Sequence, residues 1–260
     1  MNVKFNKHNR MMEIEYQYRD VDEPNLFRNI YPYNEVPRLV FNQRIVPMNI
    51  PEKLYITDTT FRDGQQSRSP YTVEEISRLF DLIHKLDNGS GIIRQSEFFL
   101  YSKVDREAVF KCLEKGYRFP EVTAWIRARK EDFQIVKAIG IRETGILVSC
   151  SDYHIFKKLK MNRTQAMNQY LEIVEAALEA GIVPRCHFED ITRADFYGFV
   201  LPFASKLMEL SEKAGIPVKI RACDTLGLGV SIPGVALPRS VPQIIYVLVN
   251  YGGVPSENLE

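Results

Sequence analysis

Two adjacent residues of opposite charge, Arg62 and Asp63, are the first candidates for chemistry in this chain. They follow a short apolar run that ends at Asp58, and Gly64 comes directly after them. A carboxylate is a preferred ligand of hard divalent cations, and a guanidinium stabilises negative charge that develops on oxygen. The pair is therefore typical of a site that binds a metal and a carbonyl compound, but an ion pair that only stabilises a turn has the same residues.

Further polar residues recur at the ends of successive apolar runs. They are Gln95, Ser96 and Glu97, then Arg127 and Arg129, then Ser149, Ser151 and His154, then His187 and Glu189, and finally Asp224 and Thr225, which Gly227 follows. Taken singly, His154 and His187 are also explained as packed side chains, and Asp224 as a turn cap. Glu189 also suits a position that only complements a helix dipole. The recurrence at one run end after another favours a shared site.

The segments that must position these residues alternate between short apolar runs, typical of buried strands, and longer stretches of helical period. The predicted strands cover residues 54–58, 92–99, 119–125, 143–149, 182–188 and 217–223. The predicted helices cover residues 73–87, 103–115, 130–138, 163–180, 194–214 and 241–251. Thr72 suits the start of the first helix, and Gly181 and Gly215 suit the ends of two others.

The alternation of strands and helices indicates the fold class. Each strand is followed by enough chain for a right-handed crossover helix, so the strands are expected to run parallel. No glycine-rich GxGxxG motif follows the first strand, which argues against a dinucleotide-binding fold. We therefore predict an α/β protein with a (β/α)8 TIM barrel, of which about six βα units lie in this chain. In such a barrel the polar residues at the carboxyl ends of the strands meet at one end.

The first fifty residues differ in composition from the rest. They are rich in Asn, Arg, Tyr and Pro and show no sustained period. We predict an irregular N-terminal arm over residues 1–50 and a partial TIM-barrel catalytic domain over residues 51–260. The residues expected to hold the arm on the domain are Tyr31, Tyr33, Phe41 and Met48.

The sequence reaches Glu260 at the point where a seventh strand is expected. We therefore expect the remaining strands to lie beyond Glu260 or in another protein. The first and sixth strands would otherwise be open edges, which invite pairing with a second chain. A homodimer or other homo-oligomer is the predicted assembly.

The composition excludes several classes of partner. Apolar residues make up 45% and charged residues 26% of the chain, and the formal net charge is +1, which gives no reason to expect nucleic acid or an anionic membrane. The sequence has no apolar run of about 20 residues and no signal peptide. Its cysteines, which show no metal-binding spacing, are Cys112, Cys150, Cys186 and Cys223. We predict a soluble cytoplasmic protein with reduced thiols that acts on small molecules.

Four motifs in the correct order resemble one family of metal-dependent aldol and Claisen enzymes with a (β/α)8 barrel. This family contains isopropylmalate, homocitrate and citramalate synthases and hydroxymethylglutaryl-CoA lyase. The motifs are TDTTFRDGQQ, SDYHIFKKLKMNRTQAM, HFEDITRAD and CDTLG, and the resemblance covers roughly residues 52–250. Within this family, the segments GIIRQSEFFLYS and GIVPRCHFEDITRAD are most similar in sequence to the Re-type citrate synthases.

The resemblance implies an acyltransferase that condenses acetyl-CoA with a 2-oxo acid. Oxaloacetate is the expected acceptor, with 2-oxoglutarate, 2-oxoisovalerate and pyruvate as alternatives. A lyase, a biotin-dependent carboxyltransferase and a barrel fragment without catalysis are the other possibilities. The segment SDYHIFKKLKM favours the synthases over the lyase.

The resemblance also implies roles for individual residues. Asp63 would be a ligand of a divalent metal, Mn²⁺ or Mg²⁺, and Arg62 would stabilise the enolate or the alkoxide. Glu189 would act as acid or base, or orient a metal-bound water. His154 would line the pocket for the acceptor, and Thr225 would bind the acceptor's carboxylate.

Three further residues are substrate-binding candidates: Gln66, Gln95 and Glu97. The family's second and third metal ligands come from a His–x–His motif on the seventh strand, and this sequence has no such motif. One carboxylate cannot bind a hard cation tightly, so the remaining ligands are expected beyond Glu260. The chain alone is therefore expected to be inactive or nearly so.

Overall fold

The computed structural model describes residues 2–8, 10–15, 20–24, 26, 28, 39–41, 44–46, 54–127 and 129–260. The chain divides into two compact units, Met1–Leu39 with Ile45–Met48 and Val40–Arg44 with Asn49–Glu260. Near the N-terminus, β1 (Asn2–Asn6) and β2 (Met11–Glu15) form an antiparallel pair. Strands β3 (Leu39–Phe41) and β4 (Arg44–Val46) form another two-stranded sheet. Tyr31, Tyr33, Met48 and the side chain of Phe41 lie outside what is described, so the predicted attachment of the arm stays a prediction.

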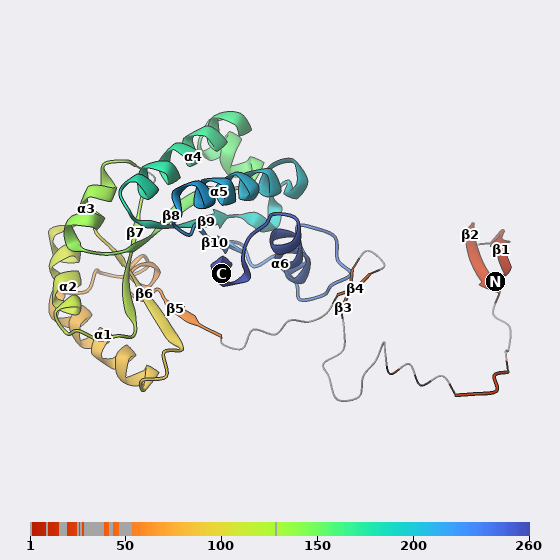
Figure 1. Ribbon diagram of the computed structural model, residues 1–260, viewed down its shortest axis with the longest axis horizontal. Helices are drawn as coiled ribbons and strands as arrows, with labels where there is room; N and C mark the ends of the chain where they lie inside the picture. Colours follow the sequence, from red (N-terminus) through yellow and green to blue (C-terminus); the bar gives the residue numbers. More distant parts are fainter. Residues whose placement is uncertain are drawn as a thin grey trace. The chain divides into compact units, whose positions relative to one another are not determined.

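The larger unit is built on a sheet of six parallel strands whose spatial order follows the chain, from β5 to β10. The strands are β5 (Ile56–Asp58), β6 (Ile93–Phe99), β7 (Glu121–Ile126), β8 (Glu143–Ser149), β9 (Val183–Glu189) and β10 (Lys219–Ala222). Figure 1 shows the strands curving around one side, with the helices outside them. The predicted six βα units of a partial (β/α)8 barrel are confirmed.

Apart from the start of α5, the helices begin and end close to their predicted positions. They are α1 (Val73–Asp87), α2 (Lys103–Leu113), α3 (Asp132–Ile139), α4 (Arg163–Glu179), α5 (Leu201–Ala214) and α6 (Val241–Asn250). Thr72, Ser102 and Asn162 each cap a helix through a reciprocal capping box, which satisfies backbone N–H groups that the first turn leaves free. Gly215 ends α5 with a φ of +65°, a conformation that glycine adopts without steric cost.

One predicted helix differs in the structure. The stretch predicted as a helix over 194–214 begins instead with extended backbone at Ala194 and a π-helical turn over Phe196–Val200, and only then continues as α5. Pro202 lies in the first turn of α5 and has no N–H to donate. The regular pattern of hydrogen bonds therefore starts later than the apolar period indicates.

Alternation along the strands separates an apolar outer layer from a polar interior. Residues such as Ile146, Val148 and Phe188 face the helices and are buried with them. The residues between them, among them Glu97 and Arg185, are also buried, although they are charged. The sheet therefore has an ordinary hydrophobic core only on its helix-covered face.

Replacing Phe203 by Ala is expected to lower the free energy of unfolding by about 3–5 kcal/mol. Its ring is fully buried between α5 and the sheet, with ring centroids 5.2 Å from Phe188, 5.8 Å from Tyr170 and 5.9 Å from Phe199. Urea unfolding followed by circular dichroism measures the change. Phe110→Ala is the control, because that ring on α2 is 47% exposed and its loss should cost less than about 1 kcal/mol.

Candidate active site

The turn after β5 holds Arg62 and Asp63 in place. Phe61 is buried and stacks on Phe98 of β6 with ring centroids 4.6 Å apart. The backbone N–H of Arg62 donates to the carbonyl of Thr59 at 3.0 Å. The Asp58 carboxylate accepts hydrogen bonds from the hydroxyls of Thr60, at 2.6 Å, and of Ser96. The turn is therefore anchored on both sides before it presents its two charged residues.

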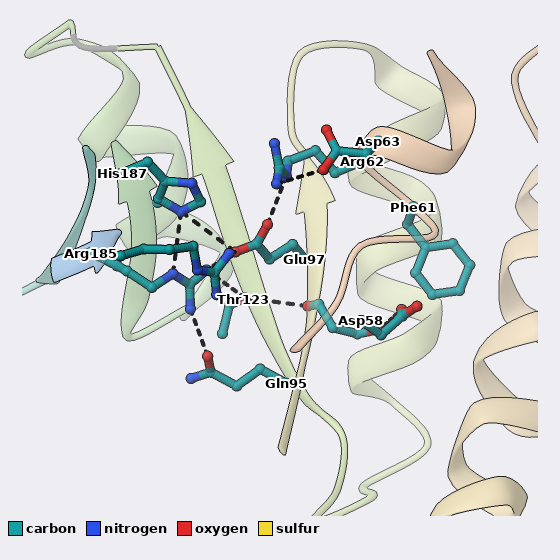
Figure 2. Close-up of polar contacts among 12 residues, drawn as sticks. Asp58, Phe61, Arg62, Asp63, Gln95, Glu97, Thr123, Arg185 and His187 are labelled. Carbon is teal, nitrogen blue, oxygen red and sulfur yellow. Dashed lines mark hydrogen bonds and ion pairs between the residues drawn. The ribbon is translucent and has the colours of Figure 1, made fainter. Parts of the chain in front are cut away.

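Arg62 bridges two carboxylates at the carboxyl end of β5. Its Nε lies 2.7 Å from Oε2 of Glu97, and its Nη2 lies 2.7 Å from Oδ2 of Asp63. The Arg62 side chain is 13% exposed and that of Asp63 is 48% exposed. Figure 2 shows Arg62 between the two acids. The sequence left two interpretations of Arg62 and Asp63, an ion pair that only stabilises the turn and a functional site. In the structure the two residues do form an ion pair, and the same pair lies at the carboxyl end of the sheet.

Glu97 is the centre of a buried ion-pair network. Its Oε1 accepts a hydrogen bond from Nη1 of Arg221 at 2.6 Å and another from Nη2 of Arg185. Arg185 also donates to Gln95 and to Glu143, each at 2.6 Å, and Figure 2 shows the contact with Gln95. Three arginines, from the turn after β5, from β9 and from β10, therefore share one carboxylate. Such a network is stable only because each charge has hydrogen-bonding partners.

Arg185 and Arg221 were not among the site residues predicted from the sequence. The signal that could have found Arg185 is the period of two in RCHFE, which places Arg185, His187 and Glu189 on one face of β9. Burial, and then the positive charges of Arg221, Arg185 and Arg62, hold the pKa of His187 well below its usual range. His187 is therefore a neutral imidazole inside the barrel.

A second cluster surrounds Glu189 at the carboxyl end of β9. Its carboxylate accepts hydrogen bonds from the Ser149 hydroxyl at 2.5 Å and from the Lys158 ammonium at 3.0 and 3.1 Å, and Nδ1 of His154 lies 2.9 Å away. Burial favours the protonated acid, but these hydrogen bonds and the Lys158 charge outweigh it, so the pKa of Glu189 is lowered. Glu189 is therefore an ionised carboxylate near neutral pH.

The other predicted residues also lie at the carboxyl ends of the strands, but their side chains have different partners. Nε2 of His154 lies 3.8 Å from the buried carboxylate of Asp190, so His154 lies between two acids. The Thr225 hydroxyl accepts a hydrogen bond from the Asp190 N–H at 2.8 Å. Gln66 is exposed and lies 3.4 Å from Asp63. Asp224 accepts hydrogen bonds from the N–H groups of Leu228 and Gly229, as expected for a turn cap.

The described residues do not by themselves form a metal site. Asp63 is a suitable ligand, but its carboxylate is already paired with Arg62. Within the described ranges no three His, Cys, Asp or Glu side chains are grouped so as to hold a metal ion. That further ligands come from elsewhere therefore remains a prediction.

The cysteines are free thiols in the structure. Cys112, Cys150 and Cys186 are buried and Cys223 is partly buried. Burial raises the pKa of the Cys112 and Cys186 thiols to about 12 and that of Cys223 to about 11. They are therefore uncharged at neutral pH.

Across the described residues no helix has the length and apolar character needed to cross a membrane.

Gly145 on β8 makes room for two interior side chains. An added Cβ would lie 2.6 Å from Cδ1 of Trp125 and 2.8 Å from Nε2 of His187. Gly145→Ala is expected to cost about 1–3 kcal/mol of stability and to shift the fluorescence of Trp125, the only tryptophan in the sequence. Urea unfolding and an emission spectrum measure the two effects. Gly234→Ala is the control, since nothing lies within 4 Å of its added Cβ, and an equal effect of both changes would contradict the prediction.

A curved parallel sheet covered by helices, with acids and arginines at the carboxyl ends of its strands, is typical of (β/α)8 barrel enzymes. The chain belongs to the HMGL-like family, which matches residues 53–248. The predicted family is thereby confirmed.

Individual relatives refine this similarity. The chain is 61% identical over 246 residues to the citrate (Re)-synthase of Clostridium kluyveri, covering 95% of this chain and 54% of that protein. It is 53% identical to the citrate (Re)-synthase of Syntrophus aciditrophicus, covering 99% of this chain and 42% of that protein. The crystal structure of hydroxymethylglutaryl-CoA lyase from Pseudomonas aeruginosa has the same fold, with a TM-score of 0.55 and 17% identity over 82% of this chain and 68% of that one. The chain spans about half the length of the curated relatives it matches.

Proposed function

We propose that this chain forms part of the active site of an acyltransferase that condenses acetyl-CoA with oxaloacetate to give citrate. The observation that carries the proposal is the position of Arg62, which two carboxylates hold at the same end of the sheet as the ionised Glu189. The similarity to two citrate (Re)-synthases supports the choice of substrates.

The chemistry of this reaction matches the two clusters. A base must remove a weakly acidic proton from the acetyl methyl group, and Glu189 is a carboxylate that is ready to accept one. Negative charge then develops on oxygen, and the Arg62 guanidinium is fixed in advance to stabilise it. His154 and Thr225 are proposed to contact the oxo acid, with Gln66, Gln95 and Glu97 as further polar groups of the site.

Asp63 is proposed as one ligand of a divalent metal, Mn²⁺ or Mg²⁺. When bound, such a metal would polarise the carbonyl group of the oxo acid. We also propose a cytoplasmic location, in keeping with the free cysteines. We further propose a homo-oligomer formed through the edge of the sheet at β5, since Leu259 and Glu260 already pair with β10. A monomer in light scattering would contradict the assembly.

A thiol-release assay tests the proposed reaction. Acetyl-CoA and Mn²⁺ are supplied with oxaloacetate, 2-oxoglutarate, 2-oxoisovalerate or pyruvate, first to this chain and then to a version extended past Glu260 by a segment with a His–x–His strand. We expect release of CoA with oxaloacetate from the extended version and little from the chain alone. Preference for another oxo acid would contradict the choice of acceptor. Full activity of the chain alone would contradict the proposal that metal ligands are missing.

A further inference from the structure

A π-helical turn over Tyr153–Lys158 lies against Glu189. Three residues separate it from the end of β8, and the N–H of Leu159 donates to the carbonyl of His154, five residues earlier, at 2.9 Å. A turn of this width is rare and is often found at functional sites. Here it brings His154 and Lys158 to the same carboxylate.

The two oxygens of Glu189 have unequal surroundings. Oε2 lies 2.5 Å from the Ser149 hydroxyl, 2.9 Å from Nδ1 of His154 and 3.0 Å from the Lys158 ammonium. Oε1 is contacted by Lys158, at 3.1 Å, and by no other hydrogen-bonding side chain of the described residues. Oε2 therefore has little capacity left, while Oε1 retains a free lone pair.

We propose that Lys158 is a positioning residue. It contacts both oxygens of Glu189, while Ser149 and His154 occupy Oε2 alone, so that Oε1 is the atom that accepts the proton of acetyl-CoA. This inference rests on the proposed function. In the step, the methyl C–H bond breaks and its proton forms an O–H bond with Oε1. The electron pair of the broken bond moves into the thioester, whose carbonyl oxygen becomes the enolate oxygen.

None of the other titratable groups near Glu189 could replace the positive charge of Lys158. Burial raises the pKa of Cys150, Cys223 and Tyr170, so all three are neutral. Asp190 is close to His154, but its carboxylate is paired with Arg193 at 2.6 Å. The Lys158 ammonium is therefore the cation whose removal should change Glu189 most.

The turn is anchored independently of Lys158. Arg163 donates to both carboxylate oxygens of Asp152, at 2.8 and 2.7 Å, and to Asp195 at 2.8 Å. It thus ties the start of the turn to the segment after β9. Since the Lys158 side chain is 48% exposed, its replacement should leave the fold intact.

The first test is a pH titration of the Glu189 carboxyl carbon by ¹³C NMR, with Glu189→Gln used to assign the signal. We expect Lys158→Met to raise the titration midpoint by about one pH unit, because an adjacent cation no longer favours the ionised form. Lys158→Arg should restore most of the shift. Lys157→Met is the matched control, since this neighbouring lysine in the same turn is exposed and should leave the midpoint unchanged.

The second test is the exchange of acetyl-CoA methyl protons with deuterated solvent, on the version extended past Glu260. In Lys158→Met the low-pH limb of the profile should shift to higher pH by about one unit. At a pH on that limb, the exchange rate should therefore be about tenfold lower than in the parent. An unchanged titration midpoint in Lys158→Met would overturn the positioning role. A shifted midpoint with no exchange in any variant would support the positioning of Glu189 but contradict the proposed reaction.

Discussion

Replacing Glu97 by Gln is expected to destabilise the protein by about 3–5 kcal/mol, the usual cost of removing one partner from a buried ion pair. The Glu97 side chain is fully buried and is shared by Arg62, Arg185 and Arg221. Glutamine keeps the size but brings N–H groups toward guanidinium donors and removes the negative charge. Arg62 should also lose its orientation, because Asp63 alone then holds it.

Urea unfolding of Glu97→Gln measures this loss. Glu107→Gln, an exposed acid on α2, is the control and should change stability by no more than about 0.5 kcal/mol. In a double-mutant cycle with Arg185→Gln, the combined loss should be smaller than the sum by about 0.5–3 kcal/mol. Simple additivity would show that the contact between Glu97 and Arg185 contributes little.

Replacing Glu189 by Gln is expected to reduce CoA release by about 10²- to 10⁴-fold in the version extended past Glu260. The amide cannot accept a proton from the acetyl group, yet it has nearly the same shape. Ser149 and Lys158 can still donate to its oxygen, so the surrounding turn should persist. The thiol-release assay measures the rate, and circular dichroism confirms the fold.

The control for Glu189→Gln is Glu175→Gln, on the exposed face of α4. It should retain the activity of the parent. Full activity of Glu189→Gln would exclude this residue as the base. Another group would then have to remove the methyl proton of acetyl-CoA.

Local patterns were sufficient to predict most of the fold. The strand predicted over 143–149 is observed as Glu143–Ser149, and the helix predicted over 73–87 is observed as Val73–Asp87. Both depend on local causes, apolar period and a capping box, which the sequence shows directly. The π-helical turn over Tyr153–Lys158 was not predicted, because no local pattern marks it. Its side chains contact Glu189, 31 to 35 residues further along the chain.

The site was only partly predictable for a similar reason. Glu97 was a candidate because it lies near a strand end, but its role as the shared partner of three arginines depends on β5, β9 and β10 converging on β6. The contact between Arg221 and Glu97 joins residues 124 positions apart. No local period marks such a pair. An alternating face that is polar along several successive strands is the signal to look for.

The charged interior also constrains how this protein can fold. Arg185 cannot be taken out of water at low cost until Gln95, Glu97 and Glu143 are in place, and these come from β6 and β8. Adding the strands one at a time would pass through states with an unpaired guanidinium. We therefore expect the transition state for folding to resemble the native structure and to contain β6, β8 and β9 together. Because these contacts join residues far apart in the sequence, refolding should be slow.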